Sequence, residues 1–323
     1  MKKTAPIVLL IVAAVAAISV GSSQVEGFWS ALLNPGSNEI VWQIRFPRVM
    51  AAVIVGAALG IAGLMAQGAC NNAIAEPAIL GTAAGASFGA VIGIATGVVQ
   101  VGSLAALAFG TAGALLATSI TFRLAAFRGA LSSFNLIIVG IAVSAIFTSL
   151  VGITSAVLNR ADTRSISFWS LGSLALVTNE NLLGLIITTL AGAVIAWFIA
   201  PMLDRLSLGD QSAFHLGVNV PRVRLFALIS LSLLAGGAVS TVGVIAFIGL
   251  AAPHIARFIY GPSHRALIIH SALIGALIVL VADTLARTIA QPNELPIGLA
   301  TALIGAPILI TLVTVKNNVW KTQ

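Results

Sequence analysis

Few side chains in this sequence could carry out covalent or metal chemistry. The histidines are His215, His254, His264 and His270, and no two of them have the H-x-x-x-H spacing of a metal-binding helix face. The single cysteine, Cys70, excludes an internal disulfide and any multi-cysteine metal site. The chain also lacks a G-x-x-x-x-G-K-S/T phosphate loop, so a nucleotide would have to be bound by another chain. We therefore expect no catalytic residue, no metal site and no cofactor in this chain.

Carboxylates offer a second kind of chemistry, which is proton transfer. Asp283, Glu294 and Glu76 could form a proton relay, because ionisable residues within membrane spans are functional candidates by default. Asp283 and Glu294 lie at a predicted outer helix end, however. Arg287 follows Asp283 by four residues, so the two can pair on one helix face. We therefore favour a structural role for Asp283 and Glu294.

The elements that must position these side chains are membrane helices. Of the 323 residues, 59% are hydrophobic and 8% are charged, which leaves too little polar surface for a soluble protein. Uninterrupted apolar runs of about 18 residues or more indicate transmembrane helices, whereas β-barrel strands would alternate apolar and polar residues. The net charge of +7 fits basic residues on cytoplasmic loops better than a nucleic-acid partner. We expect an all-α polytopic membrane protein that forms a single domain over residues 1–323.

About ten spans are predicted. They cover residues 6–22, 49–68, 78–98, 103–122, 134–157, 181–201, 224–243, 244–260, 267–289 and 297–315. The region 225–256 is read as two crossings, at least one of them short or broken near Gly243 and Pro253. With the N-terminus inside, this places eleven basic residues on inner segments and five on outer ones, in the expected direction. The first span also resembles a signal peptide; a retained span suits a polytopic protein better, and both readings stay open.

A polar segment interrupts this apolar chain at residues 203–224, "LDRLSLGDQSAFHLGVNVPRVR". The charge count places it on the cytoplasmic side. Ser207 or Asp210 could cap a short helix and Gly217 could end it, which predicts two short helices joined by a turn. An apolar face then favours docking to a cytoplasmic partner over a plain solvated loop; it consists of Leu206, Leu208, Phe214 and Leu216.

Four motifs occur in order along nearly the whole chain: Arg45–Arg48 (R-x-P-R), Gln67–Gly81, Gly243–Arg257 and Asp283–Pro307. Together they resemble the permease family of ABC importers for ferric siderophores, haem and cobalamin. One departure is Asn72-Ala73-Ile74-Ala75, where the family usually has N-P-L-A, and it concerns the local turn at an inner helix junction. The resemblance implies a type II ABC importer permease fold in the cytoplasmic membrane of a prokaryote.

The resemblance also implies roles for particular residues. In the family, the loop after the sixth span carries coupling helices that dock in a groove of the ATPase, and the matching residues are Leu206, Ser207, Leu208, Gly209, Leu216, Gly217 and Val218. Arginines on the outer face meet acidic residues of a substrate-binding protein, which here implies Arg45, Arg48 and Arg287. The translocation path and gate correspond to Asn72, Ile74, Ser133, Ser144 and Thr148, with close helix packing as the alternative role for the path serines.

The expected function is therefore that of a permease subunit in an ATP-driven importer, not of an enzyme. It would form a homodimer in the lipid bilayer with two ATPase subunits, which carry ATP and Mg, and an external binding protein. The expected cargo is a ferric siderophore first, then haem, then cobalamin. A proton-coupled secondary transporter and a channel are the rivals, but no convincing inverted repeat and no filter-like ring is visible in the sequence.

Overall fold

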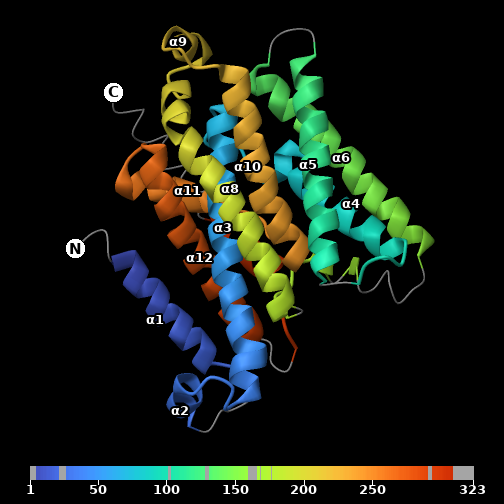
Figure 1. The fold of residues 1–323 in the computed structure, drawn as a ribbon, viewed down its shortest axis with the longest axis vertical. Helices are drawn as coiled ribbons and strands as arrows, with labels where there is room; N and C mark the ends of the chain where they lie inside the picture. The colour runs from blue at the N-terminus through green and yellow to red at the C-terminus, as the bar shows by residue number, and fades with distance from the viewer. Residues whose placement is uncertain are drawn as a thin grey trace.

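The computed structural model describes residues 5–21, 27–100, 103–127, 131–158, 166–167, 169–175, 177–289 and 293–307. All regular elements in these ranges are helices, and no strand occurs among them (Figure 1). A helix pairs its backbone N–H and C=O groups within its own segment, which lipid demands of any membrane-spanning chain. The all-α prediction is confirmed.

The central helix is α3 (Phe46–Cys70), which follows a π-helical turn over Ile40–Arg45. It packs against α8 (Asn179–Leu206), α10 (Val220–Val242), α11 (Ile248–Tyr260) and α12 (His264–Ile289). Most of its side chains are buried by these neighbours. Helix α3 runs from one end of the molecule to the other, so residues at its two ends belong to one continuous helix (Figure 1).

Small residues allow α3 to approach its neighbours closely. A Cβ on Gly60 would overlap the carbonyl oxygen of Ser271 in α12, and one on Gly63 would overlap the backbone of Gly249 in α11. Any larger residue at these positions would force the helices apart. The small-residue patterns of residues 56–68 therefore serve tight helix packing, as predicted.

A second group of helices lies on the other side of α10 (Figure 1). It comprises α4 (Thr82–Ala95), α5 (Leu104–Ala126) and α6 (Ser133–Val157), and the short 3₁₀ turn Pro77–Leu80 leads into it. Of the long helices, α6 keeps the smallest share of its apolar window inside the chain, 22%. On the opposite side, α1 (Ala5–Ser19) leads toward the short α2 (Phe28–Leu33).

Each predicted span overlaps a helix within the described ranges, but the count of ten crossings is not confirmed. Six helical segments in the described ranges are long and apolar enough to cross a membrane, and shorter apolar helices cover Pro6–Ser19, Thr82–Ala95 and Ile297–Pro307. The predicted span 244–260 becomes the 13-residue α11. Residues 308–315 of the last predicted span lie outside the described ranges.

The expected break in the region 225–256 occurs at Gly243 and not at Pro253. Gly243 has φ 78° and ψ −169°, a conformation that residues with a side chain rarely adopt, and α10 ends just before it. Pro253 lies inside α11 and does not end that helix. Phe247, at φ 68°, forms the N-cap of α11, and its backbone N–H donates to Glu76 Oε1 at 2.8 Å. Glu76 therefore fixes the non-helical stretch between α10 and α11 to the turn that follows α3.

Candidate functional site

The polar segment 203–224 folds differently from the prediction of two short helices. Helix α8 continues to Leu206, and a single six-residue helix, α9 (Asp210–His215), follows it at the top of Figure 1. Ser207 does not cap α9, because its Oγ donates to the carbonyl of Asp204 at 2.7 Å and closes α8. Asp210 is the first residue of α9, and the N-cap position belongs to Gly209. The predicted caps at Ser207 and Asp210 are therefore wrong.

The predicted end of this helix at Gly217 is confirmed. Gly217 has φ +77°, and its N–H donates to the carbonyl of Phe214 at 2.9 Å. The N–H of Val218 donates to the carbonyl of Ala213 at 3.0 Å. These two bonds form a Schellman motif, in which a glycine takes the left-handed conformation just past the helix end. Ala213 and Val218 are both buried, so the motif fixes α9 to the chain beneath it.

The predicted apolar face of the segment divides into an inner and an outer part. Leu206 is fully buried, whereas Leu208, Phe214 and Leu216 are 64%, 72% and 51% exposed. An open hollow of about 480 Å³ lies beside α9 and is lined by residues that include Asp210, Phe214 and Leu131. Three large apolar side chains therefore project outward at the end of the molecule that bears α9. We call Leu208, Phe214 and Leu216 the exposed apolar triad.

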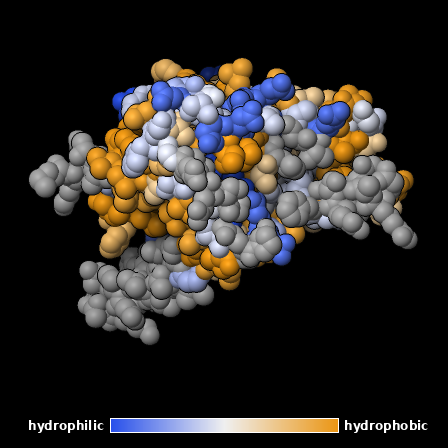
Figure 2. Space-filling view, turned by 90° about the horizontal axis from the view of Figure 1, so that it is seen from below, coloured by the Kyte–Doolittle hydropathy of each residue, from blue (hydrophilic) through white to orange (hydrophobic). Residues whose placement is uncertain are grey.

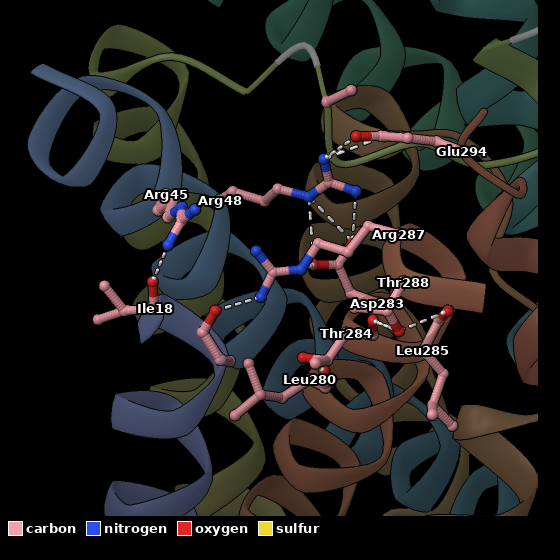
Figure 3. Close-up of polar contacts among 12 residues, drawn as sticks. Ile18, Arg45, Arg48, Leu280, Asp283, Thr284, Leu285, Arg287, Thr288 and Glu294 are labelled. Atoms are coloured by element: carbon pink, nitrogen blue, oxygen red, sulfur yellow. Dashed lines mark hydrogen bonds and ion pairs between the residues drawn. The ribbon is translucent and has the colours of Figure 1, made fainter. Parts of the chain in front are cut away.

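A cluster of charged side chains lies at the opposite end of α3 (Figure 3). Arg48 Nη2 and Nε contact the Asp283 carboxylate, with Nη2 to Oδ1 at 2.9 Å, and Arg48 Nη1 donates to Glu294 Oε1 at 2.9 Å. Arg287 Nε lies 3.7 Å from Asp283 Oδ2, which is the pair expected four residues apart on α12. We call Arg45, Arg48, Asp283, Arg287 and Glu294 the outer cluster.

Two arginines of the outer cluster also bind the end of α1. Arg45 Nη1 donates to the carbonyls of Ile18 and Ser19 at 2.9 and 3.0 Å, and Arg287 Nη2 donates to that of Ala17. The last carbonyls of a helix lack partners within the helix and carry the negative end of its dipole, so cations stabilise them. No sequence spacing relates α1 to α3 and α12, so this use of the arginines could not be predicted from the sequence.

The outer cluster is largely buried, although the end of the molecule that holds it carries polar surface. Figure 2, the view from below, shows hydrophilic residues gathered over the middle of this end and hydrophobic residues on both sides. Arg45 and Arg287 are 5% and 7% exposed, and the Arg48 side chain is 11% exposed. Glu294, with a side chain 41% exposed, is the most open member. Docking through the three arginines thus stays a prediction, and a partner's carboxylates would have to compete with these internal bonds.

The predicted path and gate residues fall into two places. At the end of α3, Asn72 Oδ1 accepts the N–H of Ile74 at 3.1 Å, and Ile74 is 58% exposed. Ser133 begins α6, and its Oγ accepts a hydrogen bond from Arg224 at 2.9 Å.

The other path residues lie farther along α6. Ser144 Oγ donates to the carbonyl of Ala78 at 2.9 Å, and Thr148 is exposed. The local turn at residues 72–75 forms without the proline of the usual family motif, since the Asn72 side chain closes it.

Two further observations concern ionisable groups. Burial raises the pKa of the Glu76 carboxyl, while the hydrogen bond from the Phe247 backbone N–H acts in the opposite direction. Within the part of the chain that the structure describes, no three His, Cys, Asp or Glu side chains gather as a metal site would require. His264 instead contacts Asp204, with Nδ1 to Oδ1 at 2.7 Å.

Comparison with known proteins relates this geometry to a family. The profile of the FecCD transport family matches residues 7–315. The chain is 37% identical over 293 residues to the ferric enterobactin transport system permease protein FepD of Escherichia coli, covering 84% of this chain and 86% of FepD. It is 35% identical over 281 residues to the hemin transport system permease protein HmuU of Yersinia pestis, covering 84% of this chain and 83% of HmuU.

A solved structure agrees with these relatives. A metal-chelate type ABC transporter in an inward-facing conformation superposes with a TM-score of 0.83 at 29% identity, covering 96% of this chain and 97% of the other. The match of fold therefore extends over almost the entire length. The chain belongs to the FecCD transport family, the permease subunits of ABC importers for ferric siderophores, haem and cobalamin.

Proposed function

We propose that this multi-pass permease moves an iron complex, a ferric siderophore or haem, into the cytoplasm by alternating access. It acts as a homodimer in the cytoplasmic membrane of a prokaryote. Two ATPase subunits bind ATP and Mg, and an external binding protein delivers the cargo. The permease itself is a translocation subunit and not an enzyme, as its relatives are permeases. The iron-complex assignment is supported by relatives named for ferric enterobactin and hemin transport.

The observation that carries this proposal is the exposed apolar triad around α9. Leu208, Phe214 and Leu216 project from a segment whose helix is closed by the Schellman motif, at the end of the molecule opposite the outer cluster. Exposed apolar side chains grouped on one surface mark a protein or membrane contact. With the coupling role implied by the family, the segment 206–218 serves as the contact through which ATPase motion reaches the membrane helices. Leu206 and Val218 support it from inside.

Uptake into liposomes tests the proposal directly. The permease is reconstituted with its ATPase, the binding protein is added outside, and ferric enterobactin, hemin and cobalamin are offered separately. We expect ATP-dependent accumulation of one of the two iron compounds. Accumulation of cobalamin alone would replace the cargo assignment by the cobalamin alternative and leave the importer mechanism intact. Absence of ATP-dependent uptake of all three with a functional ATPase would remove the proposal.

One conservative substitution at Glu76 distinguishes the ATP-driven importer from a proton-coupled secondary transporter. In Glu76→Gln the side-chain oxygen can still accept the Phe247 N–H, so the local fold is kept while the titratable group is lost. We expect ATP-driven uptake to persist in this variant. Loss of uptake in Glu76→Gln, together with collapse of wild-type uptake by a protonophore in the absence of ATP, would favour proton coupling.

The translocation path is proposed to lie along α6 at the homodimer axis. Only 22% of the apolar window of α6 is buried within one chain, so the helix has surface left for a second copy and for a path. Ser144 and Thr148 give this surface modest polarity, which suits a large cargo that must pass without being trapped. Crosslinking of a cysteine placed at Ile141, which is 54% exposed and seven residues before Thr148 on the same face of α6, should join two copies of this chain. A permease that assembles only with a different permease chain would exclude the homodimer.

A further inference from the structure

Arg224 is the last residue of the polar segment 203–224 and the fifth residue of α10, and its side chain is fully buried. A guanidinium group has five N–H donors, and each of the five makes a hydrogen bond here. The Nε donates to the carbonyl of Ala69 at 3.0 Å, and Nη1 and Nη2 bind the two carboxylate oxygens of Asp210, each at 2.9 Å. The two remaining donors bind the Leu131 carbonyl and the Ser133 hydroxyl. From the sequence, Arg224 is predicted only to be one of the cytoplasmic basic residues.

These partners come from three separate parts of the fold. Asp210 begins α9, Ala69 belongs to the last turn of α3, and Leu131 and Ser133 lie at the start of α6. The end of α3 leads directly into the turn that carries Asn72 and Ile74. Arg224 therefore joins the proposed ATPase contact to both places where the inner gate is predicted. One side chain connects residues that are 14, 91 and 155 positions away in sequence.

The ion pair is asymmetric in a way that constrains α9. The Arg224 side chain is 0% exposed, while that of Asp210 is 45% exposed at the surface of the segment. Asp210 is the one acid with which Arg224 forms an ion pair in the described ranges. Removing one partner of such a buried pair is strongly destabilising, because the other charge is left buried without compensation. A shift of α9 must therefore carry Arg224 and its other partners along, or break the pair at a large cost.

We propose that Arg224 is the positioning residue that transmits motion of α9 to the inner gate at Asn72–Ile74 and Ser133. The inference rests on the proposed importer function, because it names the side chain through which ATPase-driven motion would reach the gate. When the ATPases displace α9, the bidentate Asp210–Arg224 pair moves the Ala69 carbonyl and the start of α6 with it. Arginine is required because lysine offers a point charge without the planar fork that binds five acceptors at once.

The test follows the gate itself and needs no cargo. Ile74→Cys is introduced into the full complex in nanodiscs, and its reaction with a membrane-impermeant thiol reagent is followed without nucleotide and with ATP plus vanadate. Cys70 is buried, and the same complex without Ile74→Cys measures its background. ATP hydrolysis is measured on the same samples. With Arg224 in place, the labelling rate of Ile74→Cys should change when the nucleotide is added.

Arg224→Lys should keep ATP hydrolysis within about twofold of the wild type and reduce the nucleotide-dependent change at residue 74 by about tenfold, a typical coupling between distant sites. Asp210 lies within the proposed ATPase contact, so Asp210→Asn is read by the gate response per ATP hydrolysed, which should fall by about tenfold. The matched control is Arg222→Lys, since Arg222 is an exposed arginine in the same turn, and it should leave both readings unchanged.

The outcomes separate the two proposals. If the wild-type complex neither hydrolyses ATP nor transports, the importer function fails. If the wild type responds to nucleotide at residue 74 and Arg224→Lys and Asp210→Asn respond equally, the relay through Arg224 is wrong while the importer stands. Should Arg224→Lys not fold, Asp210→Asn decides. If neither variant folds, or if both lose ATP hydrolysis and gate response in the same proportion, Arg224 is a structural residue and the inference is overturned.

Discussion

A buried arginine forms an ion pair with an aspartate at each end of α3, but the two aspartates lie on very different helices. At the outer end, Arg48 binds Asp283, a fully buried carboxylate on the 26-residue helix α12. At the inner end, Arg224 binds Asp210, a half-exposed carboxylate on the six-residue helix α9. Both arginines are well buried and both are satisfied. The outer pair therefore connects two long, packed helices, whereas the inner pair connects a packed helix to a short surface element.

From this difference we expect a fixed end and a movable end. Asp283 cannot move without α12, which packs along most of α3. The outer cluster also anchors the end of α1 through Arg45 and Arg287. Helix α9 is a short surface helix in which Phe214 faces outward and Ala213 is buried, and the Asp210–Arg224 pair links it to the ends of α3 and α6. We infer that the molecule responds to its ATPase at the α9 end while the outer cluster keeps its geometry.

The largest effect is expected from removing the buried acid of the outer cluster. Asp283→Ala would leave Arg48 and Arg287 without their shared carboxylate, and breaking a buried pair in this way costs about 3–5 kcal/mol. We expect a much lower thermal unfolding temperature of the purified permease. Glu294→Ala is the matched control, because its half-exposed side chain is worth about 1 kcal/mol or less. Equal stability of the two variants would mean that Asp283 does not hold the fixed end together.

A smaller effect, seen mainly in transport, is expected from straining the Schellman turn. Gly217→Val introduces no steric contact, since nothing lies within 4 Å of the new Cβ, but it forces a β-branched residue into φ +77°. The left-handed conformation costs about 1–2 kcal/mol in such a residue, enough to lower the population of the native α9 by about tenfold. ATP-driven uptake per ATP hydrolysed should fall accordingly.

Gly97→Val provides the control for backbone strain alone. Gly97 has φ +72° and equally open surroundings, but it lies between α4 and α5, away from α9. It should lose similar stability and keep its uptake per ATP hydrolysed. If both variants lose coupling to the same extent, the shape of α9 has no special part in transport.

The exposed apolar triad should contribute to partner binding and not to permease stability. Phe214→Ser removes the most exposed member and should weaken ATPase binding by about tenfold, or about 1.4 kcal/mol. The permease alone should unfold at the same temperature as the wild type. Leu33→Ser, at a similarly exposed residue of α2, should leave ATPase affinity unchanged. Unaltered ATPase binding of Phe214→Ser would place the contact elsewhere.

The smallest effect concerns docking at the outer end. If the three arginines attract acidic residues of the binding protein, Glu294→Gln removes an opposing charge and should modestly raise the association rate at low salt. The difference should disappear at high salt, where exposed charges are screened. A slower association would show that Glu294, and not the arginines, faces the partner.

Sequence patterns predicted those features that local spacing determines. Long apolar runs predicted the helices, and Gly217 predicted the end of α9. The four-residue spacing of Asp283 and Arg287 predicted their ion pair. The break near Gly243 was predicted differently, from the charge balance that requires two crossings in residues 225–256. Pro253 was a false signal because α11 continues through it.

What the sequence could not predict depends on packing between distant segments. The partners of Arg224 lie up to 155 residues away, and those of Arg45 lie 26 and 27 residues away on another helix. Nothing in the local sequence distinguishes Arg224 from Arg222, although one is buried and the other exposed. The single clue was the basic residue itself, since a cation inside an apolar helix requires partners.

A pair of distance measurements on the full complex in nanodiscs tests most directly whether the inner end moves and the outer end stays fixed. Spin labels at Gln211 on α9 and Ile269 on α12 report the inner end, and labels at Leu33 on α2 and Ile289 on α12 report the outer end. Labelled permease is diluted with unlabelled chains so that distances within one chain are read. We predict that trapping with ATP and vanadate shifts the Gln211–Ile269 distance and leaves the Leu33–Ile289 distance unchanged. An unchanged inner distance, or a larger shift at the outer pair, would contradict this account.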